Sequence, residues 1–313
     1  MSGPTVLAFG GNALLTDASR PAFQDEVARS FAQAVSWLLP VRQGMVLVHG
    51  NGPQVGMILL RIEATKQRLP PESLDVLVAE TEGSIGYLLC RALRNRIVGR
   101  EIAAVLTQVV VDAGDLGFAH PSKPVGPFYS ADEAGELREK QGWRMAEAPG
   151  RGWRRVVASP RPMAIVELHT IADAVGHGHL VIAGGGGGIP VVRTDENLLQ
   201  GVEAVIDKDL TAALLAILLD AERFVILTDV PHVSTGFATA SERRIARMNL
   251  VEAWRHLAAG EFAAGSMGPK VEAAASYAEE TGRPALITNA ENLEEAFWGR
   301  AGTWIWPETI MRR

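Results

Sequence analysis

Six short apolar runs constrain the fold of this 313-residue chain more than any other feature. Each contains three or four residues, and none alternates with polar residues. A strand that is covered on both faces has this pattern, whereas a strand with one face in water alternates. We therefore predict six buried strands, at residues 6–9, 45–48, 103–106, 180–183, 224–227 and 285–287.

Apolar residues recur at helical spacing between most of these runs. Alternation of strands and helices along a chain predicts a mostly parallel sheet with helices on both of its faces, which is the α/β class. The clearest helical sets are Val27, Phe31, Val35 and Leu38; Leu168, Ile171, Ala174 and Val175; and Leu210, Leu214, Ile217 and Leu218.

Charge and length narrow the functional classes. The chain has a net charge of −6, which argues against a general nucleic-acid or membrane-surface binder because such proteins need a basic face. Hydrophobic residues make up 47% and charged residues 21%, which excludes disordered, coiled-coil and collagen-like chains. The length fits one large domain or two modest ones.

The sequence predicts a cytoplasmic protein. Cys90 is the single cysteine, so no disulfide can form within the chain, as expected in a reducing cytosol. The first ten residues lack the basic start and apolar centre of a signal peptide. No uncharged run approaches the roughly 18–20 apolar residues of a membrane span.

Residues 112–157 interrupt the alternation of strands and helices. This stretch shows little periodicity and is rich in proline, glycine and aromatic residues, among them Pro121, Pro124, Tyr129 and Trp153. We expect it to leave the main sheet, either as a small subdomain or as a lid.

Three of the apolar runs end directly in glycine-rich loops, at residues 10–12, 49–52 and 184–188. Ligands of open α/β sheets bind at the carboxyl ends of the strands, and glycine turns there let backbone N–H groups approach a phosphate. Each loop taken alone could also be a structural turn, and the run of five glycines could be a flexible joint.

Two common nucleotide-binding patterns are absent from their usual context. The residues 184–187 fit the glycine spacing of a dinucleotide-binding loop, but Ile189 and Pro190 then begin an extended segment instead of a helix. No P-loop pattern occurs. A Rossmann dehydrogenase and a Walker-type ATPase are therefore both disfavoured.

Lysine is rare in this chain, since only five of its 30 basic residues are lysines. Lysine supplies a compact, flexible point charge, whereas arginine is a planar fork. Lys123, Lys208 and Lys270 stand beside proline-, acid- or glycine-rich turns, although each could also be a solvated surface residue. Lys66 and Lys140 lie in polar helical contexts, where we expect surface residues.

Lysines that converge on a phosphate site indicate phosphoryl transfer, in which catalysis is mainly positioning and electrostatic stabilisation. Asp207 precedes Lys208 and would hold ammonium groups in place, or it would cap the helix that follows. Both roles are compatible. We expect no catalytic histidine.

Eight segments of the sequence resemble, in order, the motifs of the carbamate kinases in the amino acid kinase family. They are GGNAL at 10–14, HGNGPQVG at 49–56, KPVGPFY at 123–129, GWRRVV at 152–157, GGGGIP at 185–190, GVEAVIDKDL at 201–210, LTDV at 227–230 and GSMGPK at 265–270. The resemblance implies a single three-layer αβα domain, which forms a homodimer and catalyses ATP + carbamate ⇌ ADP + carbamoyl phosphate with Mg²⁺.

The resemblance also implies roles for individual residues. Residues 1–195 would form an N-terminal lobe, including a subdomain at about 112–157 from which Lys123 reaches the site. Residues 196–313 would form the nucleotide lobe, where Asp207 would organise Lys208 and Lys270. Carbamate and the phosphoryl group would meet Gly10, Gly11, Asn12, Gly50, Asn51, Gly52, Gly185 and Gly186. The nucleotide would meet Lys208, Lys270, Thr228, Asp229, Val230, Met267 and Gly268.

The resemblance leaves Mg²⁺ to the nucleotide phosphates and implies small-molecule substrates, with ATP made from carbamoyl phosphate in arginine catabolism. The chain departs from the family pattern at the subdomain entrance, residues 115–118, and again at 232–237, where the departure indicates different contacts on the adenine side. Two alternatives stay open: another acid kinase of this fold, or a catalytically silent regulatory or binding relative. Intact lysines disfavour the second, and the lack of a motif for a larger acceptor disfavours the first.

Overall fold

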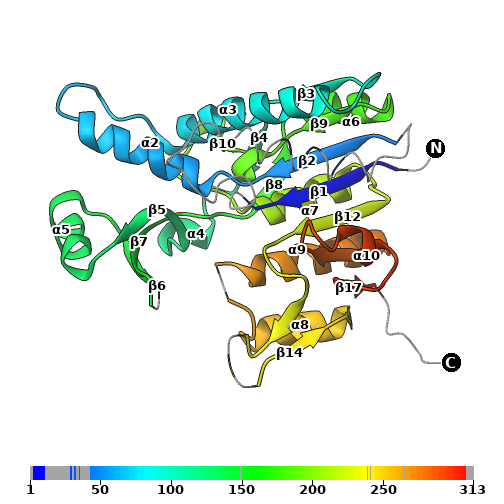
Figure 1. Cartoon of the computed structure of the whole chain (residues 1–313). Coiled ribbons are helices and arrows are strands. Elements are labelled where there is room, and N and C mark those ends of the chain that lie inside the picture. Colours follow the sequence, from blue (N-terminus) through cyan, green and yellow to red (C-terminus); the bar gives the residue numbers. More distant parts are fainter. Residues whose placement is uncertain are drawn as a thin grey trace.

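An eight-stranded sheet forms the centre of the structure, a computed structural model that describes residues 3–10, 29, 32, 35, 43–148, 150–237, 239, 241–263 and 265–307 (Figure 1). The strand order is β15-β17-β16-β12-β1-β2-β9-β3. The strands are β1 (Thr5–Phe9), β2 (Met45–His49), β3 (Ile102–Ala104), β9 (Leu180–Ile182), β12 (Arg223–Leu227), β15 (Arg247–Asn249), β16 (Ala285–Thr288) and β17 (Thr303–Trp306).

The central sheet is mostly parallel, as predicted. Neighbouring strands run parallel throughout, except where β16 meets β17 in antiparallel register. In β1, Thr5 pairs with Met45 of β2 on one side and with Arg223 of β12 on the other. All five residues of β1 are buried, which explains the continuous apolar run at 6–9.

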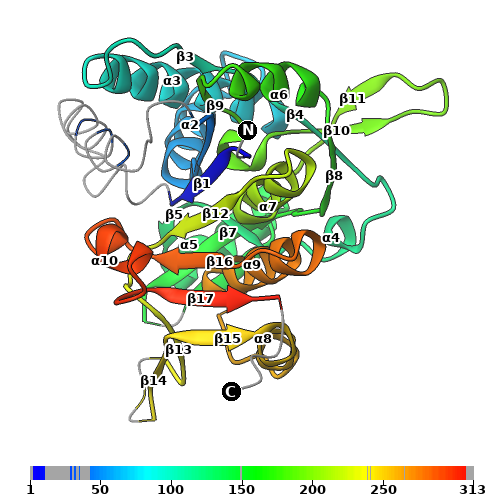
Figure 2. The ribbon, with the colours of Figure 1, turned by 90° about the vertical axis from the view of Figure 1, so that its right-hand side faces the viewer.

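Helices cover both faces of the sheet, so the domain has three layers (Figure 2). Side chains of a strand point alternately to opposite faces. Val6 and Ala8 of β1 accordingly pack in one core with α6 (Leu168–Gly176), α7 (Lys208–Leu218) and α9 (Met267–Thr281). Leu7 and Phe9 pack in the other core with α3 (Leu74–Arg94) and α10 (Leu293–Phe297).

Five of the six strand predictions are confirmed, and the sixth is partly wrong. The run 103–106 was expected to be a buried strand, but β3 ends at Ala104 and Leu106 is 55% exposed. β3 is the edge strand of the sheet, so one side of it has no neighbouring strand in the described chain. The helical sets at 168–175 and 210–218 are confirmed as α6 and α7. The set at 27–38 lies largely outside the described residues.

A second sheet lies beside the first and contains strands that the apolar runs did not predict. Its order is β11-β10-β4-β8, formed by β4 (Gln108–Val111), β8 (Pro162–Ile165), β10 (Ile189–Arg193) and β11 (Leu199–Gly201). The five-glycine segment connects β9 of the large sheet to β10 of this one through a short 3₁₀ turn, η2 (Gly185–Gly187). The glycine run therefore joins two sheets.

The stretch at 112–157 contains more regular structure than its irregular sequence suggested. It folds into α4 (Leu116–Ala119), β5 (Lys123–Tyr129), α5 (Ala131–Gln141), β6 (Met145–Ala148) and β7 (Gly152–Val157). The three strands form their own sheet, which projects from the main body together with α5 (Figure 1). The exact bounds of this subdomain, and the lobe boundary at 195, stay predictions.

The remaining elements complete the two ends of the domain. α2 (Gly52–Thr65) packs along β5, and α8 (Leu250–Ala258) packs on α9. β13 (Val233–Thr235) and β14 (Arg243–Ile245) form a small antiparallel pair. Within the described part of the chain, no helix has the combined length and apolar character that crossing a bilayer requires.

Candidate functional site

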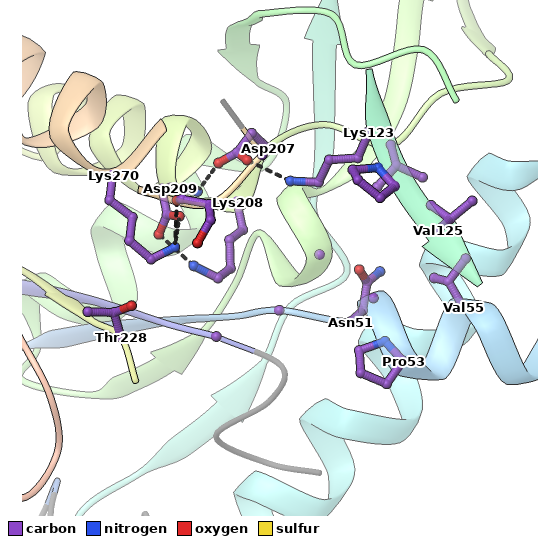
Figure 3. A pocket seen from close by; sticks show the side chains of 18 of the residues that line it. Asn51, Pro53, Val55, Lys123, Val125, Asp207, Lys208, Asp209, Thr228 and Lys270 are labelled. Atoms are coloured by element: carbon purple, nitrogen blue, oxygen red, sulfur yellow. Dashed lines mark hydrogen bonds and ion pairs between the residues drawn. The ribbon is translucent and has the colours of Figure 1, made fainter. Parts of the chain in front are cut away.

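A pocket of about 250 Å³ opens where β1, β2 and β12 end (Figure 3). Gly10 follows β1, Gly50 follows β2, and Leu227 is the last residue of β12. Because these strands are parallel neighbours, their carboxyl ends meet at one edge of the sheet. The volume is below the roughly 300–1,000 Å³ of sites that enclose a drug-sized ligand, so the pocket suits part of a nucleotide rather than all of it.

Three helices begin at this pocket: α2, α7 and α9. Gly52, Lys208 and Ser266 line the pocket at the first turn or the N-cap of these helices. The first backbone N–H groups of a helix have no partner within the helix, and its N-terminus attracts anions. Neither α2 nor α9 has a side-chain hydrogen bond that caps its first turn. Their N–H groups therefore favour binding of a phosphate.

Asp209 holds two lysines together at the wall of the pocket (Figure 3). Its Oδ1 accepts a hydrogen bond from Nζ of Lys208 at 2.5 Å, and its Oδ2 accepts one from Nζ of Lys270 at 3.0 Å. Burial opposes ionisation of Asp209, but the two lysine charges lower its pKa below the ordinary value. One buried carboxylate thus fixes two ammonium groups.

The two lysines respond differently to their surroundings. Burial lowers the pKa of Lys208, although Asp209 opposes this effect. For Lys270 burial acts in the same direction, but the charge and hydrogen bond of Asp209 prevail and raise its pKa above the ordinary value. An incoming phosphate would stabilise the charged form of both lysines.

Asp207 makes a separate ion pair with Lys123, which comes from the projecting subdomain. The Nζ of Lys123 lies 2.6 Å from Oδ2 of Asp207. The other oxygen, Oδ1, accepts a hydrogen bond from the N–H of Asp209 at 2.8 Å and so caps α7. Burial opposes ionisation of Asp207, but the charges of Lys123 and Lys208 lower its pKa.

The structure assigns the contacts of the lysines differently from the sequence-based expectation. Asp207 was expected to organise both Lys208 and Lys270, but the direct ion pairs with these two lysines belong to Asp209. Asp207 instead pairs with Lys123 and caps the helix. The Asp207 carboxylate therefore holds a different ammonium group, that of Lys123, and caps α7 at the same time.

Most of the predicted site residues that are described line this one pocket. They are Gly10, Gly50, Asn51, Gly52, Lys123, Gly186, Asp207, Lys208, Thr228, Asp229 and Lys270. Four others lie outside its lining: Gly185, Val230, Met267 and Gly268. Gly11 and Asn12 lie outside the described residues.

Two charged residues of the pocket were missing from the sequence-based set. Asp209 is one, although the alternation Asp-Lys-Asp at 207–209 offered a signal for it. The other is Arg154, which lines the pocket from β7 and donates from Nη2 to the carbonyl oxygen of Gly126 at 2.8 Å. Its signal was weak, because arginine is the default cation of this chain.

The pocket has the charge distribution of an anion-binding site. Four cationic side chains line it, Lys123, Lys208, Lys270 and Arg154, together with the N-termini of three helices.

His49 is 1% exposed and donates towards Gly50 O, and burial lowers its pKa to about 4. Among the described residues, no group of three His, Cys, Asp or Glu side chains could hold a metal ion.

Comparisons with known proteins agree with this chemistry. The model of the amino acid kinase family matches residues 3–289. The chain is 42% identical to the carbamate kinase of Thermococcus kodakarensis, over 95% of this chain and 97% of that protein. It is 45% identical to a carbamate kinase-like protein of Escherichia coli, over 97% and 99% of the two chains.

A solved structure extends the comparison to the fold. The carbamate kinase from Giardia lamblia bound to AMP-PNP is 37% identical, with a TM-score of 0.87 over 98% of this chain and 99% of that one. The family model and the relatives each span nearly the whole chain. The chain therefore belongs to the amino acid kinase family, in which it resembles the carbamate kinases.

Proposed function

We propose that this protein is a carbamate kinase that transfers a phosphoryl group between ATP and carbamate. The observation that carries the proposal is the pair Lys208 and Lys270, held by Asp209 at a pocket where three helices begin. This arrangement presents positive charge where the phosphoryl oxygens would lie. Relatives of about 40% identity are named carbamate kinases, which supports carbamate as the acceptor.

The chemistry needs no general base. Carbamate is already an anion, so its oxygen attacks the γ-phosphorus directly while the bond to the β-phosphate oxygen breaks and ADP leaves. In the opposite direction, a β-phosphate oxygen of ADP attacks the phosphorus of carbamoyl phosphate, and carbamate departs without a proton. Charge that spreads over the phosphoryl oxygens would be stabilised by Lys208, Lys270 and Lys123.

Magnesium fits this site mainly through the nucleotide. Asp207 and Asp209 are already neutralised by lysines, so they are poor candidates for metal ligands. Asp229 lines the pocket in an exposed position and would assist the nucleotide phosphates in holding the ion. Bound Mg²⁺ would neutralise charge on the β- and γ-phosphates.

The finer biological setting also belongs to the proposal. We expect the enzyme to act in the cytoplasm, with small molecules as its only substrates, and to make ATP from carbamoyl phosphate during arginine catabolism. The single cysteine and the acidic net charge are consistent with this setting.

A homodimer is supported by the edge of the central sheet at β3, which has no neighbouring strand among the residues that the structure describes. Beside edge strand β3, Tyr87 is 59% and Leu106 is 55% exposed, and Ala103 and Ala104 are exposed as well. An exposed apolar edge is a liability that pairing with a second copy would remove. Light scattering should give twice the chain mass, and Leu106→Glu should shift it towards the monomer. A monomeric parent protein would contradict the homodimer.

The test of function is ATP formation from carbamoyl phosphate, ADP and Mg²⁺ by the purified protein. A carbamate kinase should give ATP well above the rate without enzyme. ATP formation from acetyl phosphate or an acyl phosphate of an amino acid, but not from carbamoyl phosphate, would identify another acid kinase. No turnover with any acyl phosphate would support a silent relative.

A further inference from the structure

Helix α3 carries two adjacent polar residues into the interior of the domain. Thr81 is 0% and Glu82 is 4% exposed, in a helix whose other buried side chains are mostly apolar. Burying a carboxyl group is unfavourable unless hydrogen bonds compensate it. Neither residue touches the phosphoryl pocket itself, since neither lines it. Their contacts indicate what they do.

Glu82 contacts both the residue before the second sheet and the glycine segment. Its Oε2 accepts a hydrogen bond from Thr107 N–H at 2.8 Å. A Cβ atom on Gly185 would lie 3.1 Å from Glu82 Cγ, so the Glu82 side chain packs against the Gly185 backbone. Oε1 has no hydrogen-bond partner of ordinary geometry within the described chain. Burial raises the pKa of Glu82 well above its ordinary value, although hydrogen bonding to the backbone opposes this.

Two threonine hydroxyl groups fix the five-glycine segment, one near each of its ends. The Oγ1 of Thr107 accepts a hydrogen bond from Gly184 N–H at 2.8 Å, and Thr211 Oγ1 donates to the carbonyl oxygen of Gly187 at 2.7 Å. Within the segment, the N–H groups of residues 187 and 188 bond to the carbonyl oxygens of residues 184 and 185. These contacts use the N–H groups of residues 184, 187 and 188, and within the described chain none of them uses that of Gly186.

Gly186 is the glycine of the segment that lines the phosphoryl pocket. Its φ angle is +69°, and a Cβ atom there would lie 2.0 Å from Nδ2 of Asn51. Asn51 therefore packs directly against the Gly186 backbone. The same Nδ2 donates to Oγ1 of Thr81 at 2.9 Å, so Thr81 fixes the side chain of Asn51, which lines the pocket.

We propose that Glu82 is a positioning residue that orients the glycine segment so that the Gly186 N–H faces the transferred phosphoryl group. Thr107 shares this task, because it bonds to both Glu82 and Gly184. Thr81 holds the Asn51 side chain against the Gly186 backbone. The identity of the ligand rests on the proposed function, whereas the orienting role of Glu82 does not. Gly185, which the family resemblance placed among the phosphate ligands, does not line the pocket and packs against Glu82 instead.

The first test compares variants of Glu82 in the ATP-forming assay. Glu82→Gln keeps the shape and the acceptor oxygen, so its kcat/KM for carbamoyl phosphate should stay within about 3-fold of the parent enzyme. Glu82→Leu removes the acceptor and should lower kcat/KM by at least ~30-fold, since small displacements of a positioning group can reduce rates about 10²-fold. The KM for ADP should change less than about 2-fold in both variants. Ser84→Ala, at an exposed position of the same helix, is the matched control.

The second test does not depend on turnover. Hydrogen–deuterium exchange of the peptide that contains residues 184–188 should be faster in Glu82→Leu than in Glu82→Gln or Ser84→Ala. Thr107→Val, compared with Thr107→Ser, provides the same contrast if Glu82→Leu does not fold. A parent protein that makes no ATP would reject the proposed function, and the exchange data would still test Glu82.

Two results would overturn the positioning role. One is a folded Glu82→Leu or Thr107→Val protein with parental kcat/KM and parental exchange at residues 184–188. The other is a Glu82→Gln protein that loses as much activity as Glu82→Leu, since a charge-dependent role would then replace an orienting one.

Discussion

Among single residues, Lys208 and Lys270 are expected to contribute most of the electrostatic stabilisation of the transferred phosphoryl group, through their ammonium groups. We predict that Lys208→Ala or Lys270→Ala lowers kcat by at least ~10²-fold, comparable to the loss of one transition-state donor. Each substitution also leaves part of Asp209 buried without its partner, so thermal unfolding should be recorded for both variants.

Lys66→Ala is the matched control for these lysines. Lys66 pairs with Glu63 on the surface of α2, and its side chain is 38% exposed. Near-parental turnover in Lys208→Ala and Lys270→Ala would reject the role of the pair. A comparable loss in Lys66→Ala would show that overall charge, and not position, determines the rate.

Buried His49 should make the protein less stable in mild acid. Burial lowers its pKa from 6.5 to about 4 in the folded state, so between these values only the unfolded chain takes up the proton. The free energy of unfolding should therefore decrease as the pH falls from about 6.5 to 4, by up to roughly 3 kcal/mol from this residue. Denaturant titrations across this range should show a smaller decrease for His49→Gln. The exposed His177→Gln control should retain the parental decrease, and equal slopes in all three proteins would contradict the assignment.

Sequence reasoning at the residue scale located the lysines but not all of their partners. Lysine is scarce in this chain, so its position carries information, and three lysines of the predicted set lie in one pocket. Asp207 and Asp209 flank Lys208 symmetrically in sequence, and only the start of α7 distinguishes them. There the Asp207 carboxylate caps the helix while that of Asp209 reaches Lys270. Glu82 gave no signal, because its partners are backbone groups distant in sequence.

Whole elements were predictable where burial on both faces determined their composition. Strands β1, β2 and β12 lie in the middle of the sheet, so each reads as a continuous apolar run. The run at 103–106 is apolar as well, but β3 ends at Ala104 and Leu106 is exposed, so an apolar run at the edge of the sheet is not a reliable sign of a buried strand. The sequence did contain one signal for α5: Ser130 and Glu133 form a capping box, the pattern that marks a helix start.

That capping box gives a prediction at the scale of the element. Ser130 Oγ accepts a hydrogen bond from Glu133 N–H, and the Glu133 side chain bonds back to Ser130 N–H. Few residues of the subdomain are buried, so the caps should contribute much of its local order. Ser130→Ala should destabilise α5 by about 1 kcal/mol. Hydrogen exchange should become faster at 131–141, while α9 serves as an internal reference, and unchanged exchange in α5 would contradict this role.

At the scale of the whole molecule, the site exists because distant elements meet. Strand β5 brings Lys123 from the projecting subdomain to Asp207 at the start of α7. Helix α2 supports β5 at a point where two glycines touch. A Cβ atom at Gly56 would lie 2.8 Å from the Cα of Gly126. Backbone atoms of Gly126 surround that position, so the two elements could not stay at their present distance.

We therefore predict that Gly56→Ala impairs catalysis from a distance by displacing β5 and Lys123. The expected result is a decrease in kcat/KM of at least ~10-fold, because positioning errors of about 1 Å are costly. Gly176→Ala is the control, since an added Cβ there meets no atom within 4 Å. Circular dichroism and thermal unfolding should show that both variants remain folded.

A double-mutant cycle decides whether the effect of Gly56 acts through Lys123. If it does, Gly56→Ala should cost little further activity in a Lys123→Ala background, because the group that it displaces is already gone. Residues that act independently would instead give additive losses in the logarithm of kcat/KM. Additivity would mean that Gly56→Ala damages the pocket by another path, such as the N-terminus of α2, which also lines the pocket. The cycle therefore measures how strongly the subdomain and the central domain depend on each other.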